Sequence, residues 1–246
     1  MDEGIRIINV SKSFGGVNAL KNINLEIKKS QNHGLLGTNG AGKTTLVNII
    51  SGAINPDDGK LFYNKIDITG LPPYKISQLG IKRTFQKSML FDSISVEDNI
   101  ILGLLEEVGF RLSMSRNQIK EKYKDVIINT LDKFNLPHNV LKHFPHELSY
   151  GTKRIIEIAK ITLSNPSVIL LDEPTAGLTK EESNQLLDTL SLLKEDKTTF
   201  IVIEHNLNFL MKLCCQFSFM DSGEIKYSGN KEQLLFQIPE LQKLLY

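Results

Sequence analysis

Charge of one sign hardly exceeds charge of the other in this sequence, cysteine is scarce, and no long apolar run occurs. Lysine and arginine number 29, and aspartate and glutamate 28, so no strong positive field is available to attract nucleic acid or an anionic membrane. We therefore expect no nucleic-acid partner. Hydrophobic residues (41%) and charged residues (23%) occur at ordinary globular levels, which excludes the disordered and low-complexity classes.

The two cysteines, Cys214 and Cys215, are adjacent in the sequence. Neighbouring side chains point to different sides of a strand or helix, so these thiols neither pair readily nor form a metal site alone. We interpret both as buried thiols in a reducing compartment. The chain begins with acidic MDEG, and no apolar run reaches about 18 residues, so we expect a cytoplasmic protein without a signal peptide or transmembrane helix.

Strand and helix patterns alternate along the chain, which predicts an α/β fold with a parallel sheet covered by helices. A change to helical periodicity between about 93 and 148 indicates a helical insert. The last stretch, 217–229, predicts a hairpin that is followed by a C-terminal helix. The predicted strands are 5–10, 23–27, 33–37, 59–64, 81–86, 168–172 and 199–204, and the other helices start near 43, 149, 180 and 206.

The strongest local signal is GTNGAGKTT, which follows a short apolar strand and begins a helix. This order fits the phosphate-binding pattern G-x-x-x-x-G-K-[ST], in which backbone N–H groups and a helix N-terminus surround the phosphates. Lys43 is expected to reach the β- and γ-phosphates of ATP, and the Thr44 hydroxyl to bind Mg²⁺. The candidate nucleotide-binding residues are Gly37, Thr38, Asn39, Gly40, Ala41, Gly42, Lys43, Thr44 and Thr45.

Two acidic residues follow the apolar strand in VILLDEP. Adjacent acids at the end of a strand are often only solvated, but a phosphate loop earlier in the chain gives these two a chemical use. Asp172 is expected to order the Mg²⁺ shell, and Glu173 to polarise the water that attacks the phosphorus. The pair therefore favours a nucleotide hydrolase.

The segment LSYGTKR places Ser149 at a helix start and Gly151 two residues later. Alone this pattern is a helix cap. Between GTNGAGKTT and LLDEP it resembles the signature motif of ABC-transporter ATP-binding subunits, and the resemblance covers essentially the whole chain. It implies that Ser149 and Gly151 contact the γ-phosphate of ATP held by a second cassette, either a copy of this chain or a paralogue, so that a lone monomer hydrolyses ATP inefficiently.

Other positions agree with this resemblance. Gln86 in RTFQ is similar to the Q-loop residue, which implies a Mg²⁺ and water sensor and a hinge into the helical insert. His205 in IVIEH resembles the switch histidine, and Phe14 in SKSFGG resembles the aromatic residue that stacks on adenine. Thr152 and Thr179 depart from the residues usual in the family, which implies altered coupling between the cassettes of an active ATPase.

The resemblance also implies the architecture and the partners. It predicts one ABC ATPase domain over 1–246, with a RecA-like core in 1–86 and 149–246, an N-terminal antiparallel β part, and a helical subdomain in 87–148. That subdomain would dock onto membrane permease subunits at the inner face of the cell membrane. Apolar Met89, Leu90 and Phe91 either form the docking groove or fill the core of the subdomain.

The phrases LSYG, RTFQ, EPTAGLT and IEHNLNFLM resemble most the cassettes of branched-chain amino-acid importers, and TKEE is similar to the urea and short-chain amide branch. An external solute-binding protein would then be an indirect partner. A soluble ABC ATPase without a membrane partner is a weaker alternative, because such chains generally carry a second cassette, a coiled coil or zinc-binding cysteines. A P-loop small-molecule kinase would not explain LSYG, Gln86 or His205.

Overall fold

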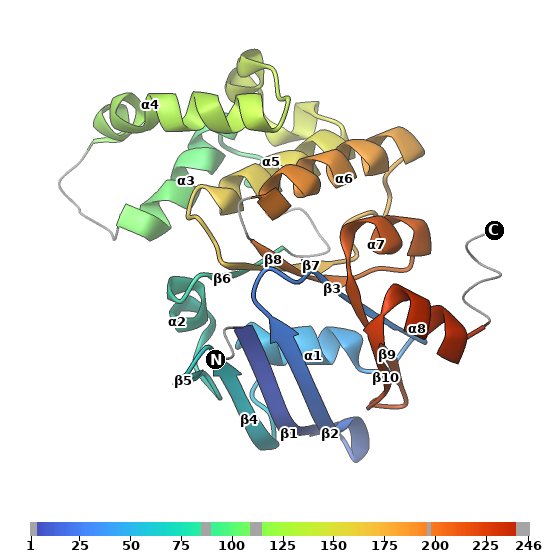
Figure 1. Ribbon diagram of the computed structural model, residues 1–246. Coiled ribbons are helices and arrows are strands. Elements are labelled where there is room, and N and C mark those ends of the chain that lie inside the picture. Colours follow the sequence, from blue (N-terminus) through green and yellow to red (C-terminus); the bar gives the residue numbers. More distant parts are fainter. Residues whose placement is uncertain (1–3, 85–89, 109–114, 196–197, 240–246) are drawn as a thin grey trace. The chain divides into compact units, whose positions relative to one another are not determined.

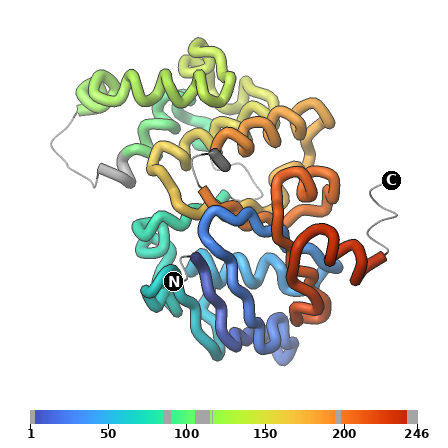
Figure 2. Tube along the Cα trace, viewed as in Figure 1, coloured from blue at the N-terminus to red at the C-terminus, as the bar shows by residue number. Residues whose placement is uncertain are grey.

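The computed structural model describes residues 4–84, 90–108, 115–195 and 198–239. Internal contacts divide the chain into two units. The first unit comprises Met1–Arg83, Ser167–Pro174 and Lys194–Tyr246, and the second comprises Thr84–Pro166 and Thr175–Leu193. The first unit thus joins the blue N-terminal third of the chain to its red C-terminal end (Figure 2). The predicted partition into a core and a helical subdomain, with boundaries at 86/87 and 148/149, stays a prediction.

A four-stranded antiparallel sheet forms the N-terminal part of the first unit. Strand β1 pairs with β2 on one side and with β4 on the other, and β5 adds the edge (Figure 1). Alternate residues of β1, among them Ile5 and Ile7, are buried, as the two-residue period of a strand requires. The bounds are β1 (Gly4–Phe14), β2 (Val17–Lys28), β4 (Asp58–Tyr63) and β5 (Ile66–Asp67).

The first unit also contains a six-stranded sheet, in the order β10-β9-β3-β8-β7-β6. Five strands are parallel, and β10 pairs antiparallel with β9, so the sheet is mixed. Every residue of β7 and β8 is buried, as expected for parallel strands covered on both faces. The bounds are β3 (His33–Gly37), β6 (Ile81–Arg83), β7 (Val168–Asp172), β8 (Thr199–Ile203), β9 (Gln216–Asp221) and β10 (Glu224–Asn230).

The register of this sheet determines which strand ends lie side by side. Leu35 of β3 and Asp172 of β7 both lie opposite Ile203 of β8. The carboxyl ends of three neighbouring parallel strands therefore lie at one edge of the sheet, where open α/β sheets bind their ligands. The segments that follow those ends are the glycine loop, the acidic pair and the histidine turn.

In the described part of the first unit, four helices are present: α1 (Lys43–Ile50), α2 (Pro73–Gln78), α7 (Leu207–Leu213) and α8 (Lys231–Gln237). Helix α1 contacts β2, β3 and β7 and buries Leu46, Val47 and Ile50 in the core of the unit. Helix α2 is not among the helices that the sequence predicts. In the structure Pro73 begins α2, because proline fits the first helical position, where its missing N–H is not needed.

Helices make up the second unit. They are α3 (Val96–Val108), α4 (Arg116–Lys133), the 3₁₀ turns η1 (His138–Lys142) and η2 (Pro145–Glu147), α5 (Tyr150–Thr162) and α6 (Lys180–Glu195). The boundary of the unit falls within the last turn of α6, after Leu193. Helix α3 contacts α4, η1 and α5. Ile100, Leu104, Leu131 and Phe134 are buried, so the helical periodicity predicted for this stretch is confirmed.

Three local expectations are corrected. Strand β6 ends at Arg83, so Thr84 lies outside it, and β8 ends at Ile203, one residue before Glu204. The interpretation of both cysteines as buried is wrong for Cys215, which is exposed, whereas Cys214 is buried. Cys214 is the C-cap of α7, and Cys215 lies between that cap and the start of β9.

His33 begins β3 and is buried among the sheet strands. Its Nε2 atom lies 2.9 Å from Ser218 Oγ, which lies 3.0 Å from Ser228 Oγ. Burial lowers the pKa of His33 to about 4, because the interior disfavours the charged imidazolium.

This shift predicts a loss of stability in mild acid. The ordinary pKa of 6.5 applies to the unfolded chain, so between pH 6.5 and 4 the unfolded state binds more protons than the folded state. The free energy of unfolding should therefore fall as the pH falls, by about 2 kcal/mol through His33 between pH 7 and pH 5. Urea unfolding of the parent and of His33→Gln at both pH values measures this loss as the difference between the two proteins. His146→Gln, at an exposed histidine, is the control, and parallel falls for the parent and His33→Gln would contradict the prediction.

Candidate active site

The glycine loop joins β3 to α1 and has a backbone that other residues do not readily adopt. Gly37 and Gly42 have φ angles of 145° and 99°. A Cβ atom at Gly37 would lie 2.0 Å from the carbonyl oxygen of Met220, and one at Gly42 would lie 2.5 Å from that of Ala19. The close passage of neighbouring backbone therefore requires glycine at both positions, as well as the positive φ.

Helix α1 begins directly after this loop, with Gly42 as its N-cap. Glycine offers no side chain to accept from the first N–H groups, and the first turn of α1 carries no acidic residue. The N-terminus of α1 therefore keeps its partial positive charge and suits an anion. Thr44 in this turn is exposed, and Thr45 is half-buried.

Lys43 extends back over the loop. Its ammonium group donates to the carbonyl oxygens of Gly37 (2.8 Å) and Thr38 (2.9 Å). Burial lowers the pKa of Lys43, and the negative charges of Glu173 and Asp172 oppose this shift. Lys43 and the two acids thus share one electrostatic neighbourhood, as the sequence predicts.

Glu173 leaves the end of β7 in a strained backbone conformation. Its φ angle is 46°, in the left-handed region that costs a non-glycine residue about 1–3 kcal/mol. The N–H group of Glu173 donates to the carbonyl oxygen of Ile203 at 2.9 Å, which holds the turn against β8. Glu173 Oε1 then lies 3.3 Å from Nε2 of His205. Strain of this kind is typical of residues whose placement serves chemistry rather than stability.

His205 follows β8 and is half exposed, with 51% of its side chain accessible. The turn that carries it is fixed by Glu204, whose carboxylate accepts from the backbone N–H groups of His205 (2.8 Å) and Asn206 (3.0 Å). Asn206 in turn caps α7. Sequence reasoning did not single out Glu204, although an acid two residues before a helix N-cap can accept from the backbone N–H groups that follow it.

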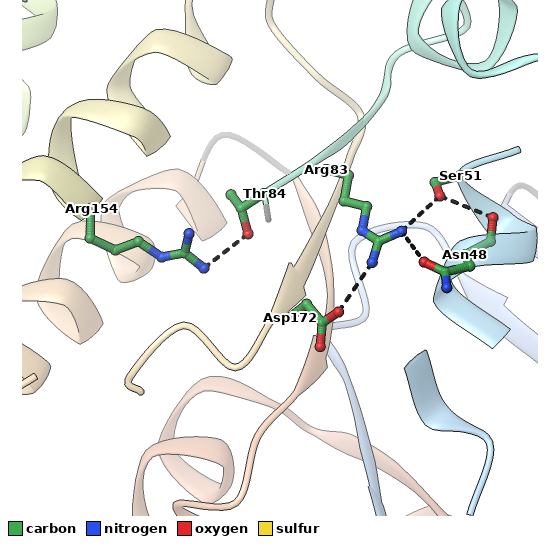
Figure 3. Close-up of polar contacts among 6 residues, drawn as sticks. All are labelled: Asn48, Ser51, Arg83, Thr84, Arg154 and Asp172. Carbon is green, nitrogen blue, oxygen red and sulfur yellow. Dashed lines mark hydrogen bonds and ion pairs between the residues drawn. The ribbon is translucent and has the colours of Figure 1, made fainter. Parts of the chain in front are cut away.

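Arg83, at the end of β6, is a second residue that sequence reasoning missed. Its Nη2 donates to Asp172 Oδ2 at 3.1 Å, and its Nη1 donates to Asn48 Oδ1 (2.5 Å) and Ser51 Oγ (3.1 Å), as Figure 3 shows. Only 10% of each side chain of the Arg83–Asp172 pair is accessible. The guanidinium thus links the acid at the end of β7 to the C-terminal half of α1.

Thr84, the next residue, is bonded elsewhere. Its hydroxyl accepts from Arg154 Nη2 at 3.2 Å, within the second unit (Figure 3). Arg154 lies on α5, is buried, and also donates to Glu157 Oε2 at 3.0 Å. Consecutive residues of the chain are therefore anchored in different units.

The N-terminus of α5 lies in the second unit and is capped as its sequence predicts. Ser149 Oγ accepts from the N–H of Thr152 at 3.1 Å. Gly151 is buried, and Thr152 Oγ1 lies 3.1 Å from Ser149 Oγ. Thr179 bonds to the first turn of α6 and so serves as a cap. The structure thus brings Lys43, Asp172, Glu173 and His205 together in the first unit and places Ser149 and Gly151 in the second.

Of three further predicted residues, the structure describes one, which is Phe14. Phe14 ends β1 with 49% of its surface accessible, and Lys12 Nζ lies 5.4 Å from its ring centroid. Gln86 and Met89 lie outside the described residues.

Within the described ranges, no three His, Cys, Asp or Glu side chains gather as a metal site. In the same ranges, no helix is long and apolar enough to cross a membrane.

Comparison with known proteins adds independent evidence. The family model for the ABC transporter matches residues 20–176, more than half of the chain. The chain belongs to the ABC transporter family. This ABC cassette is 32% identical over 231 residues to the probable branched-chain amino acid transport ATP-binding protein LivG of Archaeoglobus fulgidus, covering 92% of this chain and 89% of that protein.

Two further relatives are named for different solutes. The cassette is 30% identical to the high-affinity branched-chain amino acid transport ATP-binding protein LivG of Escherichia coli K12, covering 90% of this chain and 89% of that one. It is also 30% identical to the D-allose import ATP-binding protein AlsA of the same strain, covering 92% of this chain but 44% of the longer relative.

Solved structures share the fold of this ABC cassette. An ATP-binding cassette of an ABC transporter in its ADP conformation superimposes with a TM-score of 0.83 at 26% identity, covering 100% and 99% of the two chains. A dimeric cassette in a post-hydrolysis state bound to ADP and Pi gives a TM-score of 0.77 at 26% identity, covering 92% and 98%. The predicted α/β class and the family resemblance are confirmed, and this ABC cassette is an ATPase subunit of a transporter.

Proposed function

We propose that this ABC cassette powers the import of branched-chain amino acids by hydrolysing ATP. The observation that carries the proposal is the convergence of Lys43, Asp172, Glu173 and His205 at the carboxyl edge of the parallel sheet. The similarity to LivG proteins over nine-tenths of both chains supports the choice of solute. The similarity to the D-allose import protein makes a sugar an alternative solute. The sequence motifs leave urea or a short-chain amide as another alternative.

The triphosphate of ATP is proposed to bind along the glycine loop. The N–H groups at the start of α1 would donate to phosphate oxygens, and Lys43 would exchange the carbonyl oxygens of Gly37 and Thr38 for them. The exposed ring of Phe14 would stack on the adenine. Gly37, Thr38, Asn39, Gly40, Ala41, Gly42, Lys43, Thr44 and Thr45 form the proposed binding loop.

Mg²⁺ is proposed to bind through hard oxygen ligands that suit it. The exposed Thr44 hydroxyl and the Asp172 carboxylate are of this type, and Gln86 is the third proposed ligand. When bound, the cation would offset the negative charge that builds on the phosphates. Arg83 orients Asp172 toward this task by holding one carboxylate oxygen.

Hydrolysis requires a base for the attacking water. Glu173 is proposed to accept the water proton on its carboxylate, because the strained turn after β7 directs it toward His205. His205 would hold both the carboxylate and the γ-phosphate in place. Gln86 is proposed to complete this catalytic set by sensing Mg²⁺ and the water.

Two cassettes are proposed to act together. Ser149 and Gly151 of one would contact the γ-phosphate held by the other, which is a second copy or a paralogue. The similarity to a dimeric cassette with bound ADP and Pi supports this arrangement. Helical segment 87–148 would dock onto permease subunits at the inner face of the cell membrane, and an external solute-binding protein would be an indirect partner. Phe91, with 56% of its surface accessible, suits that contact, whereas Leu90 is buried in the unit.

Uptake measurements test the cargo. In cells that lack this chain, uptake of radiolabelled leucine, isoleucine and valine should fall at least about tenfold and return with the parent but not with Lys43→Ala, since that lysine compensates phosphate charge. Lys212→Ala, at an exposed lysine, is the control and should restore uptake. Normal leucine uptake together with lost uptake of D-allose or urea would contradict the proposed solute but not the ATPase.

A further inference from the structure

The N-terminus of α5 already has a carboxylate bound to it. Glu182, in the first turn of α6, accepts from the Ser149 hydroxyl through Oε1 at 3.1 Å. The backbone N–H of Gly151 also donates to this side chain. All three residues belong to the second unit, so the contact lies within one compact part of the chain.

Gly151 leaves the room that this carboxylate occupies. A Cβ atom at position 151 would lie 2.6 Å from Glu182 Cδ and 2.7 Å from Oε1. Hydrogen bonds from Thr179, Ser149 and Gly151 lower the pKa of Glu182. An anion therefore lies on the same hydroxyl and N–H groups that face phosphate in the proposed function, where the α5 dipole favours negative charge.

The same side chain has a structural role that can be separated from this one. Oε2 of Glu182 accepts from the N–H of Thr179 at 3.0 Å, and the N–H of Glu182 donates to Thr179 Oγ1 at 3.2 Å. These reciprocal bonds form a capping box, in which glutamine serves as well as glutamate. One carboxylate oxygen thus caps α6, and the other contacts the start of α5.

We propose that Glu182 is an internal substitute for the γ-phosphate, which holds the signature residues until ATP bound to a second cassette displaces it. The inference rests on the proposed function, in which Ser149 and Gly151 contact the nucleotide of the partner. Closure then exchanges one anion for another on the same donors, because two anions on one site repel. ADP has no γ-phosphate for this exchange, so the carboxylate makes closure selective for ATP.

Removal of the charge alone tests the proposal. In a Glu173→Gln background, which slows hydrolysis, the ATP concentration that gives half-maximal dimer is measured by analytical ultracentrifugation. Adding Glu182→Gln should lower that concentration at least about fivefold, because the like charge at the closing interface is gone while the capping box remains. The affinity of the monomer for ATP should not change, because Glu182 is not part of the Lys43 loop.

Glu181→Gln is the matched control, since Glu181 is the exposed neighbour with the same charge. It should leave the ATP requirement unchanged. An equal or higher ATP requirement for Glu182→Gln, with an unchanged circular dichroism spectrum, would overturn the proposal and assign Glu182 a structural role. If the Glu173→Gln parent itself does not dimerise with ATP, the proposed function fails and this inference fails with it.

Discussion

Replacement of Glu173 by glutamine should slow ATP hydrolysis at least about 100-fold, the usual contribution of a general base. The amide keeps the size of the side chain and can still face His205 Nε2, now 3.3 Å from Glu173 Oε1, but it cannot accept a proton from water. ATP binding should be unchanged, because the phosphate contacts of the Lys43 loop are retained. The variant should therefore accumulate as an ATP-bound dimer.

Steady-state phosphate release and dimer formation with ATP measure these two effects. Asp188→Asn is the control for the loss of one acidic group, because Asp188 is an exposed residue of α6 outside the candidate site. This variant should hydrolyse ATP at the parental rate. Turnover by Glu173→Gln at the parental rate would show that another group takes the proton.

Replacement of Arg83 by methionine should destabilise the fold by about 3–5 kcal/mol, as is usual when one partner of a buried ion pair is removed. The Asp172 carboxylate, with 10% of its side chain accessible, would lose the guanidinium 3.1 Å away. Asn48 and Ser51 would lose the same donor group. Urea unfolding measures the loss, and Arg6→Met, at an exposed arginine 5.1 Å from the Phe62 ring centroid, should cost no more than about 1 kcal/mol.

A double-mutant cycle separates the ion pair from simple packing. Because Asp172→Asn removes the charge that Arg83 balances, Arg83→Met should cost less in that background than in the parent. The expected coupling energy is about 2 kcal/mol. Costs that add without coupling would indicate that Arg83 stabilises the fold through packing and its bonds to α1 alone.

The parts of the fold that the sequence predicts well are those fixed by local pattern. Strands β3, β7 and β8 are short apolar runs, and burial on both faces requires such composition. The glycine loop is equally local, since its positive φ angles and close backbone contacts demand glycine. Helix α2 was missed because six residues beginning with proline carry no periodic signal.

The parts that escaped prediction depend on contacts between distant residues. Arg83 bonds to partners 35 and 89 positions away, which the pairing of β6 with β7 and the packing of α1 against β7 bring within reach. Glu182 bonds to Ser149, 33 positions away in the sequence. The segment TKEE therefore indicates a subfamily but does not predict this contact. The exposure of Cys215 likewise has no local signal, because Cys215 lies in the connection between α7 and β9, outside any periodic element.

Arg83 and Thr84 mark the boundary between the two units at one point of the chain. Arg83 is tied to Asp172 and α1, and the following residue is tied to Arg154 of α5. One planar peptide bond joins these two residues, so between their Cα atoms only the ψ angle of Arg83 and the φ angle of Thr84 can rotate. The chain thus changes from one unit to the other across a single peptide bond, with a hydrogen-bonded side chain on each side of it.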